Sequence, residues 1–328
     1  MKKKIIDKIK NLKIKNFKEF ILKNRKKAKI ILLILIIVIA LVVAIFSFSF
    51  NSKKTYPKQF QNNIDISSGM DEDFVSENMT RRRSDLVIGV MSDSHAEGNI
   101  YSMIAKFAKE VHIQEKGEMN PEKPDFIIEL GDFIENRNVD GNGKQPIAEG
   151  IAEWKRADES LLGFEPRYHV AGNHEMFSLR KKDYEKLIGS DSYYSFMTKN
   201  YQIIVLDANY WFPTGEDVER DREKPGAYAG FIPEKEKKWL EEKLQENSQN
   251  IIFVHHPLYG LLNSIEIEEL LTKYKDKVIL IASGHKHTAK SSTFAGIDYI
   301  DMPSLNIKKQ YAIIKIKGQK SMTSFINL

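Results

Sequence analysis

The stretch Val170-Ala171-Gly172-Asn173-His174-Glu175 passes from apolar residues through a glycine to an amide, an imidazole and a carboxylate. Val170 is typical of the end of a buried strand, and Gly172 permits a tight turn at which the backbone can approach a ligand closely. The three polar residues then follow the carboxyl end of a strand, where open α/β sheets build their sites. An ordinary loop after a strand would also explain this stretch, so its meaning depends on the rest of the chain.

Four further apolar runs end in the same way. The polar segments that follow them are Ser92-Asp93-Ser94-His95, Gly131-Asp132, His255-His256-Pro257 and Gly284-His285-Lys286-His287. Because the strands of one sheet end along one edge, their loops can bring such residues together across nearly the whole body of the chain. In an extended segment, side chains two positions apart point the same way, so Asp-x-His and His-x-His pairs can bind one ion or adjacent ions.

The remaining pattern predicts an α/β fold. Between residues 85 and 171, strand-like runs at 86–90, 126–130 and 168–171 alternate with helical patterns at 100–111 and 146–161, as in parallel βαβ units. Residues 193–196 and 201–206 read as an antiparallel hairpin, which makes the sheet mixed. Later elements are expected at 232–246, 251–254, 265–275 and 278–282, with antiparallel strands at 293–303 and 311–325. The charged stretch 214–225 reads as a solvated insertion or, alternatively, a substrate lid.

The N-terminal 84 residues read as a membrane anchor and stalk. Residues 1–29 contain 13 basic and 2 acidic side chains and form a basic cytoplasmic tail. Residues 30–50 are almost wholly apolar and, at about 1.5 Å per residue, match a bilayer core of about 30 Å, which predicts one transmembrane helix. The lysine excess before this run orients the N-terminus inward, so the catalytic domain is expected outside the cytoplasm, joined by a stalk at 51–84. A cleaved signal peptide is the alternative.

Composition narrows the chemistry of the body, residues 85–328. The net charge of the chain is +5, but the tail alone carries +11, so the remainder carries −6 and no nucleic-acid-binding surface is expected. Cysteine is absent, which excludes disulfides, thiolate ligands and a cysteine nucleophile. Imidazole, carboxylate and amide ligands without sulfur suit Mn, Fe, Zn or Co, and seven candidate ligands exceed what one ion usually takes from protein. Two divalent ions are therefore expected.

Together these motifs resemble the signature of the calcineurin-like metallophosphoesterase family over roughly residues 85–328. The resemblance implies two mixed β-sheets packed as a sandwich and flanked by helices, here preceded by one transmembrane helix. It also implies a dinuclear metal centre, with Asp93, His95 and His287 on one ion, Asn173, His255 and His285 on the other, and Asp132 bridging both. His174 would be the catalytic residue that binds no metal, with Glu175 orienting it.

Two positions depart from a branch of this family. The purple acid phosphatases carry a tyrosine three positions after the bridging aspartate, where this chain has Glu135, and they lack the histidine corresponding to His95. A purple iron enzyme is therefore disfavoured.

The predicted function is a membrane-anchored, metal-dependent phosphoesterase that hydrolyses phosphomonoester or phosphodiester bonds. Two cations would neutralise the phosphoryl oxygens and lower the pKa of a bridging water, giving a hydroxide that attacks phosphorus, while His174 protonates the leaving group. Cyclic-nucleotide phosphodiesterase and nuclease activities stay open as alternatives, because the metal core is shared among them. The alternative that is not an enzyme is a catalytically silent metal-binding interaction module.

Overall fold

The computed structural model describes residues 85–112, 123–135, 145–218, 227–247 and 249–328. The predicted tail, membrane span and stalk at residues 1–84 lie outside these ranges. Among the helices that the structure describes, none combines the length and apolarity that a membrane crossing requires.

The first of two large sheets has five strands, in the order β13 (Lys320–Asn327), β12 (Gln310–Lys317), β1 (Leu86–Met91), β2 (Phe126–Glu129) and β3 (Arg167–His169). β1, β2 and β3 run parallel, as the βαβ pattern predicts. β12 is antiparallel to both β1 and β13. The β12–β13 hairpin turns at Gly318, which has a left-handed φ of 58°.

The second sheet has six strands, in the order β10 (Lys290–Phe294), β11 (Ile297–Asp301), β9 (Val278–Ser283), β8 (Asn250–Val254), β5 (Tyr201–Leu206) and β4 (Tyr194–Thr198). The four central strands are parallel. β4 pairs antiparallel with β5, which confirms the predicted hairpin and the mixed sheet. The predicted strand at 293–303 is instead covered by parts of two strands, β10 and β11, with a turn at Ala295 and Gly296.

The two sheets pack face to face around one apolar core. Alternate residues of β1 point inward, so Leu86, Ile88 and Val90 belong to this core. They are buried together with residues of the other sheet, among them Phe253 of β8 and Ile203 of β5. The architecture is therefore the sandwich that the resemblance implies.

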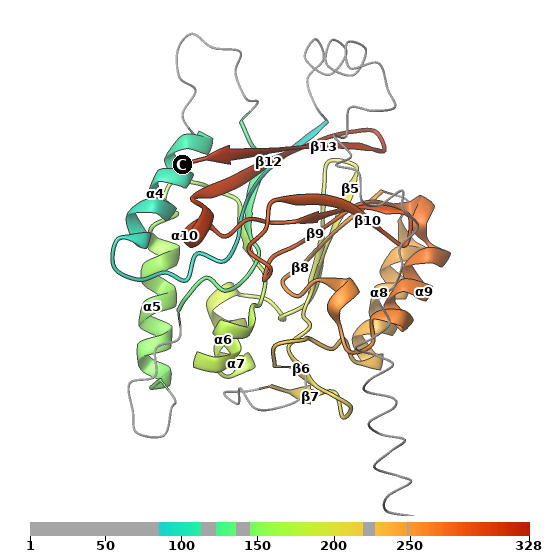
Figure 1. The fold of residues 1–328 in the computed structure, drawn as a ribbon, viewed down its shortest axis with the longest axis horizontal. Helices are drawn as coiled ribbons and strands as arrows, with labels where there is room; N and C mark the ends of the chain where they lie inside the picture. Colours follow the sequence, from blue (N-terminus) through green and yellow to red (C-terminus); the bar gives the residue numbers. More distant parts are fainter. Residues whose placement is uncertain (1–84, 113–122, 136–144, 219–226, 248) are drawn as a thin grey trace, which may run out of the picture. The chain divides into compact units, whose positions relative to one another are not determined.

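Helices cover both outer faces of the sandwich (Figure 1). α4 (Ile100–His112) and α5 (Ile147–Glu159) bury their apolar sides against the five-stranded sheet. α8 (Glu234–Glu246) and α9 (Ser264–Lys273) do the same for the six-stranded sheet. The shorter elements are α6 (Asn173–Ser178), α7 (Lys181–Ile188), α10 (Leu305–Lys308), the strands β6 (Tyr210–Trp211) and β7 (Glu216–Asp217), and the 3₁₀ turns η2 (Leu258–Gly260) and η3 (Lys275–Lys277).

The region around the opening stretch differs from the prediction. β3 ends at His169, so Val170 and Ala171 are buried beyond the strand, and Asn173 begins a helix. Glu175 explains the helix start, because its carboxylate accepts a hydrogen bond from the N–H of Gly172 at the N-cap, 2.9 Å away. The polar trio therefore lies on the first turn of α6.

Candidate metal centre

The five polar segments continue from the carboxyl ends of β1, β2, β3, β8 and β9. Five of the candidate ligands adopt a left-handed backbone, which residues other than glycine rarely do. The φ angles are 50° at Asp93, 44° at His95, 53° at Asp132, 68° at His285 and 54° at His287. Each such conformation costs about 1–3 kcal/mol and persists where the surrounding structure fixes it. The local strain is therefore concentrated where the predicted ligands meet.

Two glycines allow these loops to approach closely. A Cβ on Gly172 would clash with the backbone nitrogen and the carboxylate of Asp132, and a Cβ on Gly284 would clash with the Ser92 hydroxyl. The loop after β2 thus packs directly on the loop after β3, and the loop after β9 packs on the loop after β1. Glycine is the residue that fits both contacts.

One cluster of possible ligand atoms contains Asp93, His95 and His287, all within 4.8 Å of one another. The Nε2 atom of His287 lies 3.1 Å from Oδ1 of Asp93. These are the three residues that the family resemblance assigns to the first ion, although nearly 200 positions separate Asp93 from His287.

A second cluster contains Asp132, His255 and His285 within the same distance of one another. The Nε2 atom of His255 lies 3.2 Å from Oδ2 of Asp132 and 3.2 Å from Oδ1 of Asn173. The structure therefore brings together the residues assigned to the second ion. It also places His255 in the cluster, whereas His256 is buried behind it with its ring packed against that of His285.

Asp132 lies between the two clusters. Its Oδ2 atom is 3.9 Å from Nε2 of His95 on one side and 3.2 Å from Nε2 of His255 on the other. A third candidate group joins Asp132 to His95 and His174. This position is the one that a carboxylate shared by two cations would need.

Hydrogen bonds outside the clusters fix the ligand side chains. Nδ1 of His255 lies 2.7 Å from the carbonyl oxygen of Leu130, so Nδ1 carries the proton and Nε2 is left free to bind a metal. Nδ1 of His95 lies 3.0 Å from a carboxylate oxygen of Glu135, which can orient that ring in the same way. The Ser92 hydroxyl donates to Asp93 over 2.5 Å. Second contacts of this kind are typical of metal-binding histidines and carboxylates.

The electrostatics of the site favour positive charge. Burial opposes the charged form of His255, but the nearby Asp132 carboxylate outweighs it and raises the pKa of His255 to about 9. His95 is buried too, and Glu135, Asp132 and Asp93 together raise its pKa to about 9. Burial and the neighbouring His255 instead lower the pKa of His285 to about 4, which keeps that ring neutral. Buried carboxylates that stabilise imidazolium would stabilise a divalent cation as well, so this set of residues fits two metal ions.

His174 lies at the edge of this site, partly buried on α6. Its backbone N–H donates to Oδ1 of Asp132 over 2.9 Å, and its ring lies edge-on to that of His95 with 4.5 Å between centroids. Nδ1 of His174 is 3.2 Å from the carbonyl oxygen of Glu135. The ring is thus oriented by a backbone carbonyl.

The structure corrects the prediction that Glu175 orients His174. Its two carboxylate oxygens accept hydrogen bonds of 2.8–3.1 Å from four backbone N–H groups, those of Asp132, Phe133, Ile134 and Gly172. The side chain is buried and faces the loop after β2. Glu175 therefore holds the Asp132 loop against α6, and its contact with the backbone explains why a carboxylate follows the histidine here.

Sequence reasoning missed a second polar network beside the site. Nδ2 of Asn209 donates to the carbonyl oxygen of Ala171 over 2.9 Å and to Oδ1 of Asp207 over 2.8 Å. Nζ of Lys181 lies 2.9 Å from Oδ2 of Asp207 and 2.6 Å from Oδ1 of Asp217. The buried Asp207, which directly follows the apolar strand β5, was the available sequence signal.

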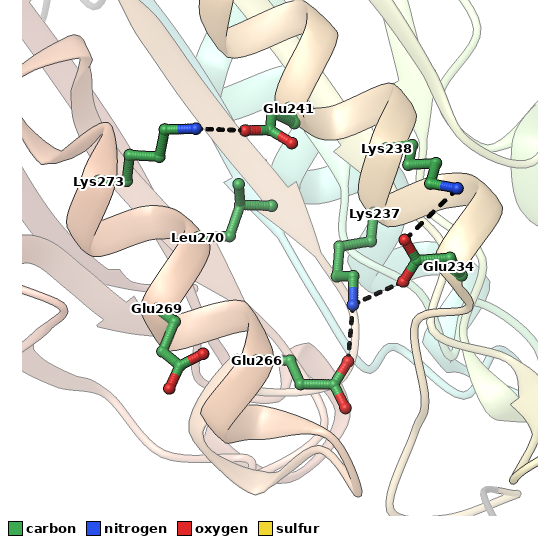
Figure 2. A pocket seen from close by; sticks show the side chains of 8 residues that line it. All are labelled: Glu234, Lys237, Lys238, Glu241, Glu266, Glu269, Leu270 and Lys273. Atoms are coloured by element: carbon green, nitrogen blue, oxygen red, sulfur yellow. Dashed lines mark hydrogen bonds and ion pairs between the residues drawn. The ribbon is translucent and has the colours of Figure 1, made fainter.

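A hollow between α8 and α9 lies apart from these residues (Figure 2). Lys237 forms ion pairs of 2.7 Å with Glu234 and Glu266, and Lys273 forms one of 2.7 Å with Glu241. The pairs of Lys237 with Glu266 and of Lys273 with Glu241 join the two helices, whereas that of Lys237 with Glu234 lies within α8. The charges neutralise one another. The hollow therefore has the character of a solvated helix contact.

Comparison with known proteins agrees with this geometry. The family model described as calcineurin-like phosphoesterase matches residues 86–289. A dimetal phosphatase from Danio rerio has a similar structure, with a TM-score of 0.57 and 15% identity over 74% of this chain and 99% of that chain. The anchor in the inner membrane complex of Plasmodium gives a TM-score of 0.51 and 12% identity over 75% of this chain and 85% of that chain. At these identities both structures show a shared fold alone, and no curated protein matches the chain significantly.

Proposed function

This chain belongs to the calcineurin-like phosphoesterase family and is a hydrolase of phosphoester bonds, and from that premise we propose that it is a membrane-anchored enzyme with a dinuclear metal centre. One observation carries the metal proposal. Asp132 contacts the histidines of both ligand clusters, at 3.9 Å from His95 and 3.2 Å from His255. Under this proposal Asp93, His95 and His287 hold one ion, Asn173, His255 and His285 hold the other, and Asp132 binds both.

The ions and the residues around them would have different roles in the hydrolysis. When bound, two divalent cations of Mn, Fe, Zn or Co would neutralise the phosphoryl oxygens and activate water as the nucleophile. The departing alkoxide needs a proton, and an imidazolium can supply one near neutral pH. Because Nδ1 of His174 contacts the Glu135 carbonyl, Nε2 is the atom that would carry this proton. Glu175 acts indirectly, by fixing the loop that carries Asp132.

Membrane anchoring is proposed from the sequence. The apolar run at 30–50 is long enough to span a bilayer, and the 13 basic residues before it favour a cytoplasmic N-terminus. The catalytic domain would then work outside the cytoplasm at the membrane surface. Its substrates would be phosphate esters in that compartment.

A substrate screen tests the proposal. The purified full chain is stripped with a chelator, reloaded separately with Mn, Zn, Fe or Co, and assayed on p-nitrophenyl phosphate, bis(p-nitrophenyl) phosphate, a cyclic nucleotide and single-stranded DNA. We expect metal-dependent hydrolysis of the simple monoester or diester. Selective turnover of the cyclic nucleotide or DNA would favour the alternative activities, and absence of turnover with bound metal would favour a silent binding module.

A further inference from the structure

An apolar wall adjoins the proposed proton donor. Phe177 follows His174 by about one turn of α6, and the ring centroids are 5.8 Å apart. Phe177 is buried in a small cluster with Val218, Ala227 and the half-buried Trp211. The wall is therefore built by α6 together with the β6–β7 segment, which Figure 1 shows beside α6 and α7.

Tyr228 forms the exposed edge of this wall. Its ring centroid is 5.2 Å from that of Phe177, yet the residue is 52% exposed. A single exposed aromatic residue is ordinary on a protein surface. This one differs because a continuous path of rings connects it to His174 through Phe177.

A buried lysine holds the wall in place. The Lys181 ammonium lies between Asp207 at the end of β5 and Asp217 of β7, at 2.9 and 2.6 Å. It also lies 3.4 Å from the centroid of the Tyr210 ring in β6. Lys181 thus ties β6 and β7 to the core, and with them Trp211 of β6 and Val218 directly after β7.

We infer that Tyr228 stacks on a planar aromatic group in the leaving alcohol, so that nucleoside phosphate esters, or esters of comparable aryl-bearing alcohols, are the preferred substrates. The inference rests on the proposed function, because a proton donor at His174 places the leaving group on this side of the site. The ring of Tyr228 is then the exposed aromatic surface that the leaving group meets beyond Phe177. Stacking on such a ring is sequence-tolerant and needs only a flat face.

Matched substrates isolate this contact. Adenosine 5′-phosphate and ribose 5-phosphate lose the same primary alkoxide and differ in the base, while benzyl and cyclohexylmethyl phosphates differ in planarity. Each is assayed with the metal-loaded full chain as the monoester and as its methyl diester, so that the comparison does not depend on the ester class. We expect kcat/KM to favour adenosine over ribose by about tenfold or more. A benzyl preference of similar size would assign the contact to aryl groups in general, and an adenosine preference alone would assign it to nucleobases.

Three variants of Tyr228 carry the test. Tyr228→Phe should keep the preference, whereas Tyr228→Ala and Tyr228→Leu should reduce it about tenfold, Leu because it retains apolar bulk without a flat ring. Phe212→Ala is the matched control, since Phe212, directly after β6, is 41% exposed but packs on Phe231. An unchanged preference in the Ala and Leu variants, or no preference in the wild type, would overturn the inference.

A binding measurement separates this inference from the proposed function. Calorimetry compares adenosine with ribose on wild type and Tyr228→Leu, without turnover. Tighter adenosine binding that the variant loses, in a protein that hydrolyses no ester, would retain the aromatic site and reject the phosphoesterase proposal. Hydrolysis without any adenosine preference in binding or turnover would do the reverse.

Discussion

His174 has two conceivable roles, proton donor and metal ligand, and an experiment must distinguish them. It lies near His95 and Asp132 in one candidate ligand group, yet Asn173 beside it contacts His255 in the proposed second ion site. We expect His174→Asn to keep both metals and to lose about 10² to 10⁴ in rate on an alkyl phosphate ester. The loss on the corresponding p-nitrophenyl ester should be smaller, because that leaving group departs almost unaided.

Metal analysis and the two rates decide between the roles, provided that chemistry limits turnover. Equal losses on both esters would instead point to electrostatic stabilisation of the phosphoryl group. A missing metal ion in the variant would make His174 a ligand.

Glu175 provides a test of the loop that carries Asp132. Glutamine at this position has one acceptor oxygen, so at least one of the four backbone N–H groups would face an amide N–H₂ group in a buried site. We expect Glu175→Gln to lower the free energy of unfolding by at least about 2 kcal/mol and to weaken metal binding. Urea unfolding and elemental analysis measure the two effects.

The control for this variant is Glu159→Gln, which changes an exposed carboxylate at the end of α5. It should leave both quantities close to wild type. Wild-type stability and metal content in Glu175→Gln would show that the backbone contacts of Glu175 are dispensable.

At the residue level, the sequence predicted which side chains meet but not how they are held. Asp93 and His287 could be placed at one edge of the sheet because both follow apolar strands, whereas their assignment to one ion came from the family resemblance. The left-handed backbone at Asp132 and the role of Glu175 could not be predicted, since both depend on contacts between loops that are distant in sequence. Glu135 stands where the purple acid phosphatases have a tyrosine, and only the structure places it against His95.

At the level of elements, a hydrogen-bonded ion pair joins α5 to β3. Nε and Nη2 of Arg167 each lie 2.7 Å from the carboxylate of Asp158, and Nε2 of His169 lies 3.2 Å from the same group. Partial burial opposes the charge, but these hydrogen bonds outweigh it and hold the pKa of Asp158 well below its ordinary value. Glu165 also pairs with Arg167 and is the other charged neighbour.

This pair predicts acid sensitivity. A carboxylate whose pKa is lowered by folding contributes stability above its unfolded pKa of about 3.9, and that contribution is lost as the pH falls through and below this value. Burial lowers the pKa of His169, but Asp158 raises it, so the comparison is made between His169→Asn and the double variant His169→Asn/Asp158→Asn. We expect the single variant, which keeps Asp158, to lose more stability than the double variant when the pH falls from 5 to 3.

Urea unfolding of both proteins at each pH measures the difference. Equal losses would show that the Asp158 pair contributes nothing to acid sensitivity.

Periodicity predicted the long elements well and the short ones poorly. Strands such as β1, β5 and β9 are fully buried, and their apolar runs predict them directly. The helical spacing of apolar residues predicts α4 equally well. β3 is shorter than predicted because its chain leaves the ladder to form the turn at Gly172. The composition of 214–225 predicts a solvated insertion or a lid. The structure instead places β7 within this segment, and Val218 directly after β7 packs against Phe177, a contact that local composition cannot reveal.

At the scale of the whole molecule, the proposed anchor determines where the enzyme works. The lysine excess before residues 30–50 predicts that the body lies outside the cytoplasm and stays attached. Protease added to intact cells or spheroplasts, followed by blotting from each end, should degrade the body and spare the N-terminal tail. Protection of the body would reverse the orientation, and a mature N-terminus near Phe50 would replace the anchor by a cleaved signal peptide.

The central claim is that one carboxylate, Asp132, binds two catalytic cations. The most direct measurement is elemental analysis of the full chain and of Asp132→Asn, after reloading and removal of loose metal, together with turnover of a simple phosphate ester. An amide cannot replace a charge shared by two cations, so we expect two ions per chain in wild type, loss of tight binding at both sites in the variant, and loss of turnover with them. A variant that keeps two tightly bound ions and full turnover would contradict the account.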